Sequence, residues 1–253
     1  DETFQCPADR ACTLHCSGGN ACKGMAFQCA ANNHCAVSCT GEETGVCERL
    51  DVDASTALSL AMSVDMEGGK RKHPDNSGPI RHGDNGARYA RVHCPRTTGS
   101  CAVTCTGRHT TDNSANIYED GSYYGPYGQP NYLCADLEID ASDVAAPSAV
   151  SLTCTGVGDQ LCRDATIDVT NVDVSGVTLA VDCSTTAKGS NSGCKQLFSR
   201  YHCEDACRGL QLVPPTPSLS CSLATCRGTN ACRGIDFACF GNGTTACAGD
   251  GAC

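Results

Sequence analysis

Short segments with one shared pattern recur along the chain: CKGMAFQC (22–29), CERLDVDA (47–54), CADLEIDA (134–141), CRDATIDV (162–169), CRGLQLVP (207–214) and CRGIDFAC (232–239). Each begins with Cys and has apolar residues at its fourth and sixth positions. Two further segments fit this frame, one with Ala in the place of the first Cys and one with two extra residues: ARYARVHC (87–94) and KQLFSRYHC (195–203). Alternation of apolar and polar residues predicts a β-strand with one buried face.

A second strand is expected after each of these segments, beyond a short polar turn. Its copies are CTLHC (12–16), CAVSC (35–39), LSLAMSV (58–64), CAVTC (101–105), VSLTC (150–154) and LAVDC (179–183). The two strands together recur every ~25–30 residues, which is a solenoid period. One unit has too little apolar surface to fold alone, but stacked units bury continuous rows. The sequence therefore predicts an all-β, single-domain right-handed parallel β-helix (solenoid) of about seven to eight coils over residues 1–253.

Cysteine makes up 24 of the 253 residues, and this even number indicates disulfides formed in an oxidising compartment. Zinc is the competing interpretation, but the chain contains no C-x2-C pair. We expect disulfides that clip the corners of the coils: Cys6–Cys12, Cys16–Cys22, Cys29–Cys35, Cys39–Cys47, Cys94–Cys101, Cys105–Cys134, Cys154–Cys162, Cys183–Cys194, Cys226–Cys232 and Cys239–Cys247. The alternatives are pairs between stacked coils, and four cysteines stay unassigned: Cys203, Cys207, Cys221 and Cys253.

The overall charge and the disulfides narrow the setting in which the protein works. A net charge of −10 argues against binding to nucleic acid or to anionic membranes. No apolar run approaches the ~18 residues of a membrane span. We expect a secreted or cell-surface protein whose signal peptide has been removed before Asp1, with N-glycosylation at Asn242.

Acidic residues share the outward side of the first strand in several coils: Asp51, Asp53, Glu138, Asp140 and Asp168. Paired carboxylates can bind Ca²⁺ or act as acid and base on a glycan. Arg91 and His93 fall between these acids in the predicted register, and this favours a charge-balanced, solvated face. We therefore expect no metal site, no cofactor and no catalytic residue.

Two long insertions, at 66–86 and 106–133, leave the same corner of adjacent coils in the predicted fold. The first is basic and contains Lys70, Arg71, Lys72 and Arg81. The second is rich in tyrosine and contains Tyr118, Tyr123, Tyr124, Tyr127 and Tyr132. Tyrosine combines an apolar ring with a polar tip, which suits contacts with sugars or proteins. Insertions of this length are otherwise tolerated flexible loops.

These patterns together resemble the cysteine-rich parallel β-helix proteins of secreted or cell-surface type. That resemblance is one of architecture, and such folds host polysaccharide lyases and hydrolases, adhesins, surface filaments and ice-binding proteins. The chain lacks the Asp-Asp, Gly-His-Gly and Arg-x-Lys motifs of the pectin hydrolases with this fold.

The first and last cysteine-rich segments look like ordinary internal coils, and head-to-tail stacking would pair their free strand edges. The alternatives are terminal disulfides and loops that cap the ends, or flanking residues that lie beyond 1–253. We therefore expect a non-enzymatic extracellular structural or interaction protein that self-associates into a filament and contacts glycan or protein through its loops. A glycan-active lyase or hydrolase is the alternative function.

Overall fold

The computed structural model of the chain describes residues 2–41, 44–67, 85–108, 132–156, 160–171, 177–185, 207–213, 221–227, 232 and 247–248. Only the backbone is described at 185, 221–227 and 247–248. All regular structure in these ranges is β-strand. In the same ranges, no helix is long and apolar enough to cross a bilayer.

The strands form two sheets, and every observed strand pair is parallel. The seven-stranded sheet consists of short strands: β1 (Thr3–Gln5), β3 (Ala26–Gln28), β5 (Asp51–Asp53), β7 (Arg91–His93), β9 (Glu138–Asp140), β11 (Thr166–Asp168) and β13 (Gln211–Val213). The eight-stranded sheet has mostly longer strands: β2 (Cys12–Ser17), β4 (His34–Gly41), β6 (Ser59–Glu67), β8 (Ser100–Arg108), β10 (Ser148–Gly156), β12 (Val177–Thr185), β14 (Cys221–Arg227) and β15 (Cys247–Ala248).

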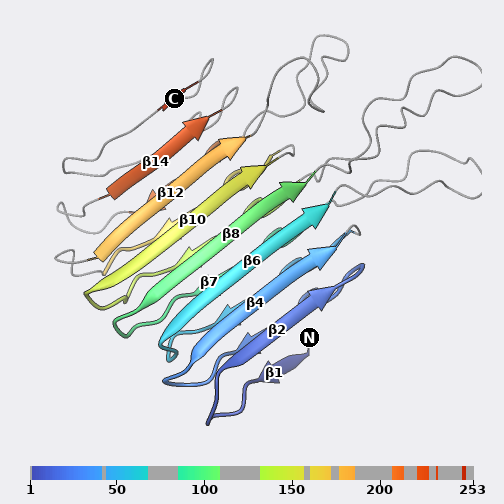
Figure 1. The fold of residues 1–253 in the computed structure, drawn as a ribbon, viewed down its shortest axis with the longest axis vertical. Coiled ribbons are helices and arrows are strands. Elements are labelled where there is room, and N and C mark those ends of the chain that lie inside the picture. The colour runs from blue at the N-terminus through green and yellow to red at the C-terminus, as the bar shows by residue number, and fades with distance from the viewer. Residues whose placement is uncertain are drawn as a thin grey trace, which may run out of the picture.

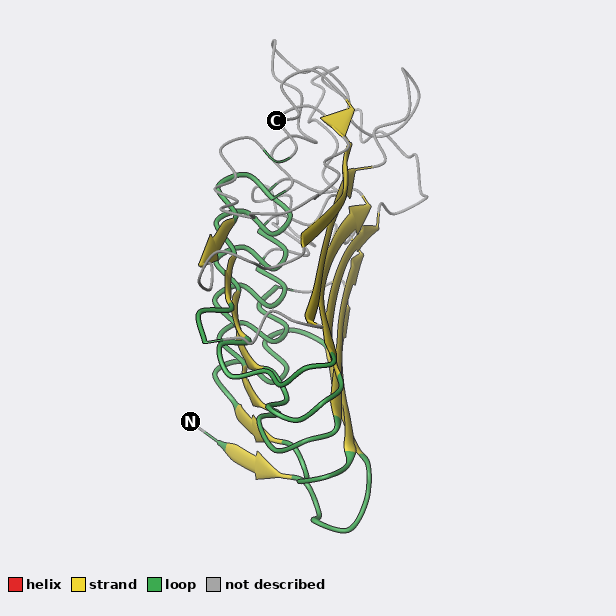
Figure 2. Cartoon of the chain, turned by 90° about the vertical axis from the view of Figure 1, so that its left-hand side faces the viewer, coloured by secondary structure: helices red, strands yellow, loops and turns green. Residues whose placement is uncertain are grey.

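From β1 to β12 the chain alternates between the two sheets, so each strand pairs with the strand two places along the sequence (Figure 1). The two sheets lie on opposite sides of the molecule and are joined by loops (Figure 2). We call a short strand and the long strand after it one repeat. Equivalent residues of consecutive repeats are in register, as in Asp51–Arg91–Glu138 and Asp53–His93–Asp140. This is the predicted register of the outward rows.

The short strands cover only the second half of the segments in which we predicted them. The residues before them form turns in which alternate residues have positive φ, for example Cys47 (55°) and Arg49 (57°). The apolar residues of the pattern still point inward: Leu50 in the turn and Val52 in the strand are both fully buried. Alternating left- and right-handed residues also repeat every two positions, so the sequence pattern could not separate this turn from a strand.

Backbone hydrogen bonds between repeats continue through these turns. The Cys47 N–H donates to the carbonyl oxygen of Ala21 in the preceding repeat, at 2.8 Å. The Arg49 N–H donates to the carbonyl oxygen of Arg88 in the following repeat, at 2.9 Å. These left-handed residues therefore satisfy their amide groups in the same repeat-to-repeat direction as the sheets.

The core is an apolar column between the two sheets, formed by the inward residues of the repeats whose side chains are described. Its largest fully buried side chains are Phe27, Leu50, Leu60, Met62, Met66, Leu133, Leu137, Ile139, Leu152, Leu161, Ile167 and Leu179. Each aliphatic side chain of this size contributes about 1.5–3 kcal/mol by leaving water. This column supplies the apolar surface that a single repeat lacks.

Disulfides join the strands and turns at both ends of the long strands. Seven of the observed pairs are those predicted: Cys6–Cys12, Cys16–Cys22, Cys29–Cys35, Cys39–Cys47, Cys94–Cys101, Cys105–Cys134 and Cys154–Cys162. No described cysteine is a free thiol. Cys232 is also disulfide-bonded, and the predicted pairs Cys226–Cys232 and Cys239–Cys247 rest on residues outside the described side chains.

The predicted pair Cys183–Cys194 is wrong, because Cys183 bonds to Cys207. Cys207 opens the turn of its repeat, as Cys162 and Cys134 open theirs, and those two also bond to the cysteine near the end of the preceding long strand. The predicted copy at 195–203 lies outside the described residues, and the described strand β11 pairs directly with β13.

Two glycines with left-handed backbone differ in how close the neighbouring repeat lies. Their φ values are 101° at Gly156 and 93° at Gly18. A Cβ at Gly156 would lie 2.1 Å from the carbonyl oxygen of Gly107, whereas a Cβ at Gly18 would meet nothing within 4 Å. We expect Gly156→Ala to lower the free energy of unfolding by about 2–4 kcal/mol, and Gly18→Ala by about 1 kcal/mol. Denaturant titration of the oxidised proteins checks this, and equal losses would contradict it.

Candidate functional site

Arg91 and His93 on β7 lie between acidic side chains of β5 and β9 on the outer face of the short-strand sheet. Arg91 lies in register between Asp51 and Glu138, and its Nη2 is 2.9 Å from Glu138 Oε2. His93 Nδ1 lies 3.0 Å from Asp140 Oδ2, and its Nε2 lies 3.5 Å from Asp51 Oδ1. Opposite charges on neighbouring strands attract, so this arrangement links three consecutive repeats on the outside.

Three of the acids also close the turn after their own strand. Asp53 Oδ1 accepts hydrogen bonds from the Ser55 N–H at 3.0 Å and the Ser55 hydroxyl at 2.6 Å. Asp140 Oδ1 accepts the same pair from Ser142, at 3.1 and 2.7 Å. Asp168 accepts from the backbone N–H two residues later, at 3.0 Å. These are Asx turns, so the acidic row has a structural role in ending the short strands.

The same contacts lower two pKa values. Burial alone would raise the pKa of Asp53, but the Ser55 hydrogen bonds and the charges of His93 and Arg96 outweigh burial and lower it. Burial likewise opposes the shift at Asp140, where the hydrogen bonds from its serine and from His93 lower the pKa. Hydrogen bonds to the ionised form are therefore the main stabilising cause at both carboxylates.

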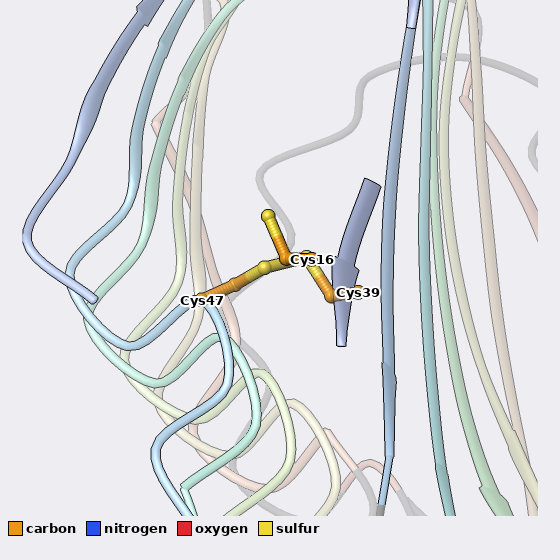
Figure 3. Close-up of side chains that lie close together, drawn as sticks. All are labelled: Cys16, Cys39 and Cys47. Carbon is orange, nitrogen blue, oxygen red and sulfur yellow. A yellow bond between two sulfur atoms is a disulfide. The ribbon is translucent and has the colours of Figure 1, made fainter. Parts of the chain in front are cut away.

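Within the described residues, the metal-ligating side chains that come close together are two groups of cysteines: Cys16, Cys39, Cys47 and Cys105, Cys134, Cys162. The sulfur atoms in each group lie within 4.8 Å of one another. All six cysteines are oxidised, so their sulfurs are not thiolate ligands. Figure 3 shows Cys16 beside the Cys39–Cys47 disulfide. These groups are disulfides of adjacent repeats stacked inside the column.

A shallow depression of about 340 Å³ lies on the outer face, where the left-handed turns meet the short strands. Its lining comes from three consecutive repeats: Arg49, Leu50, Asp51, Tyr89, Ala90, Arg91, Asp136 and Glu138. Tyr89 is 44% exposed, and Leu50 and Ala90 beneath the surface belong to the buried core. The depression thus combines one aromatic ring with charged groups of both signs.

Arginine and tyrosine side chains pack against one another beside this depression. The Arg88 guanidinium carbon lies 4.5 Å from the ring centre of Tyr89 and 4.5 Å from that of Tyr132. Arg88 Nε is also 3.3 Å from Asp136 Oδ2. Cation–π contacts of this kind fix both rings next to the ion pair. Tyr132 is where the described chain resumes after the second insertion, so this cluster lies at the foot of that insertion.

The structure describes one of the predicted loop residues, Tyr132, and brings it to Arg88. The others lie outside the described residues: Lys70, Arg71, Lys72, Arg81, Tyr118, Tyr123, Tyr124, Tyr127 and Asn242. Sequence reasoning missed Arg49 and Tyr89. A signal was present, because both stand two residues after the position of the first cysteine, where other repeats have Gly or Asp.

No protein-family model, no curated protein and no solved structure matches this chain. The likeness to cysteine-rich parallel β-helix proteins therefore rests on the parallel sheets and the many disulfides. Disulfides in this number are typical of extracellular proteins.

The lowered pKa values of Asp53 and Asp140 predict a loss of stability in acid. Their ionised carboxylates stabilise the fold at pH values above the pKa of the unfolded state, near 3.8. This contribution is lost as the pH falls through the lower pKa values of the folded state. We expect the double variant Ser55→Ala/Ser142→Ala to have a free energy of unfolding about 1–3 kcal/mol lower than the wild type at pH 7. The difference should shrink toward pH 2, because protonated carboxyls no longer favour these hydrogen bonds.

Chemical denaturation of both proteins at a series of pH values measures this difference. Ser63→Ala is the matched control, because Ser63 is exposed on β6 and makes no side-chain hydrogen bond with the described residues. A difference for Ser55→Ala/Ser142→Ala that stays constant from pH 7 to pH 2 would show that the two serines do not act through ionised carboxylates.

Proposed function

We propose that the protein is an extracellular structural or interaction protein that self-associates end to end. Its fold in this proposal is a right-handed parallel β-solenoid of about seven to eight coils with disulfide-clipped corners, and it acts without catalysis. The two insertions supply contacts with glycan or neighbouring subunits. The observation that carries the proposal is the strand edge formed by β1 and β2.

This edge combines unpaired backbone with an exposed apolar side chain. β1 pairs only with β3 and β2 only with β4, so the outer side of each strand is unpaired among the described strands (Figure 1). Phe4 on β1 is 47% exposed, whereas its register partner Phe27 is 1% exposed. The two rings stack with their centroids 5.9 Å apart. The buried column therefore reaches solvent at this edge.

A second copy of the chain is the occupant that fits this edge. In the eight-stranded sheet, β2 and β15 form opposite edges, and all strands run in the same direction. One copy added in the same orientation would extend both the parallel hydrogen bonding and the apolar row from Phe4. Contact between two different edges is heterologous, and when each copy continues the column of the copy before it, repeated addition gives an open filament.

The described outer face suits a structural role. Its acids take part in ion pairs with Arg91 and His93 or in Asx turns, and these contacts join repeats or end strands. The stacked disulfides restrict the unfolded chain, which is how small apolar columns gain stability in secreted proteins. Ion pairs and disulfides therefore both hold consecutive repeats together.

Sedimentation velocity and electron microscopy over a concentration series test the assembly. We expect thin rods that lengthen with concentration for the wild-type protein. Phe4→Asp places a charge on the edge and should leave short single rods, because a carboxylate between two stacked copies would be buried without a partner.

Leu58→Asp is the matched control, because Leu58 is 39% exposed and precedes β6 inside the sheet rather than at its edge. This variant should assemble like the wild-type protein. Wild-type rods of a single short length at every concentration would refute end-to-end stacking, and so would filaments of Phe4→Asp equal to those of the wild type.

A further inference from the structure

The last left-handed position of each turn is occupied by residue types with very different preferences for this backbone conformation. Its described members, all with positive φ, are Gly24, Arg49, Tyr89, Asp136, Asp164 and Gly209. Glycine accepts this conformation freely, and aspartate tolerates it. Arg49 and Tyr89 are the members without either property, and they stand in consecutive repeats. Tyr132 and Gln160 show that these turns accept large left-handed side chains elsewhere, so the shared location of Arg49 and Tyr89 is what singles them out.

Both of these residues line the same depression of about 340 Å³ on the outer face. Tyr89 brings an aromatic ring that is 44% exposed. The Arg49 guanidinium carbon lies 5.8 Å from the centre of that ring. Arg49 and Tyr89, both with a left-handed backbone, are therefore neighbours around one depression, next to the exposed carboxylate of Asp51.

The charged groups around the Tyr89 ring differ in their ion pairs with other described side chains. Glu138 is paired with Arg91, and Asp136 with Arg88. Arg49 forms no ion pair with the described residues, and Asp51 has His93 as its described partner, at 3.5 Å. The side of the depression formed by Arg49 and Asp51 thus offers a donor and an acceptor that can serve a ligand.

We propose that this depression binds a neutral hexose-containing glycan, with a sugar ring against Tyr89 and its hydroxyl groups hydrogen-bonded to Arg49 and Asp51. An aromatic ring covers the apolar C–H groups of a sugar, and Arg and Asp supply donors and acceptors for hydroxyls. The lining has Arg49 and Arg91 against three acids, and the protein carries a net charge of −10, so a polyanionic chain would be repelled. The depression is open and crosses three repeats, which suits a chain rather than an enclosed small molecule. This proposal does not depend on end-to-end assembly.

Tyr89→Gly is the decisive variant, because it removes the ring and relieves the backbone at the same time. We expect the wild-type protein to bind at least one of a set of neutral oligosaccharides made of glucose, mannose or N-acetylglucosamine, measured by glycan array and then by calorimetry. Tyr89→Gly should weaken that binding at least tenfold while its melting temperature stays within about 4 °C of the wild type. Arg49→Gly should also weaken that binding, because it removes the proposed hydrogen-bond donor to the sugar hydroxyl groups.

Asp164→Gly is the matched control, because Asp164 holds the same left-handed position in a repeat whose residues do not line the depression. It should bind like the wild-type protein. The proposal is overturned if no neutral oligosaccharide binds, if polygalacturonate or heparin binds more tightly than every neutral one, or if Tyr89→Gly binds unchanged. Loss of binding in Tyr123→Ala/Tyr124→Ala/Tyr127→Ala with full binding in Tyr89→Gly would place the site in the second insertion instead. Phe4→Asp should keep full binding, which separates this result from failure of the assembly proposal.

Discussion

Backbone hydrogen bonds between consecutive repeats are the interaction on which the other features of the structure depend. They run through both parallel sheets and continue through the left-handed turns, where Cys47 and Arg49 donate in opposite directions. Because each residue is held against its counterpart one repeat away, a residue type at one position of the repeat becomes a row along the molecule. The apolar column, the stacked disulfides and the outer charges are all rows of this kind.

Because each position of the repeat forms a row along the molecule, one repeat can lack a disulfide while the buried column stays packed. Val64 lies in register between Cys39 and Cys105, and Ala87 opens its turn in the place of a cysteine. Both are fully buried. A disulfide in the interior of such a column is an apolar, space-filling group, so a Val–Ala pair preserves the packing although it does not link the chain. The repeats on either side supply the covalent restraint.

The same register organises the outer face, and this part of the site could be predicted. Arg91 and His93 were expected between acids because the apolar positions alone align the repeats. The depression at Tyr89 could not be found in this way. Its lining comes from three consecutive repeats, so the depression exists only once those repeats are stacked.

Local spacing was sufficient for the alternating strands, the parallel order and seven of the observed disulfides, because each of these depends on residues close in sequence or on the repeat period. Three features needed the folded chain. The Cys183–Cys207 pair depends on which cysteine enters the turn after a long segment. The short strands and left-handed turns share one period of two, so apolar pattern alone cannot separate them. The contact of Arg49 with Tyr89 joins residues from different repeats, and only stacking brings them together.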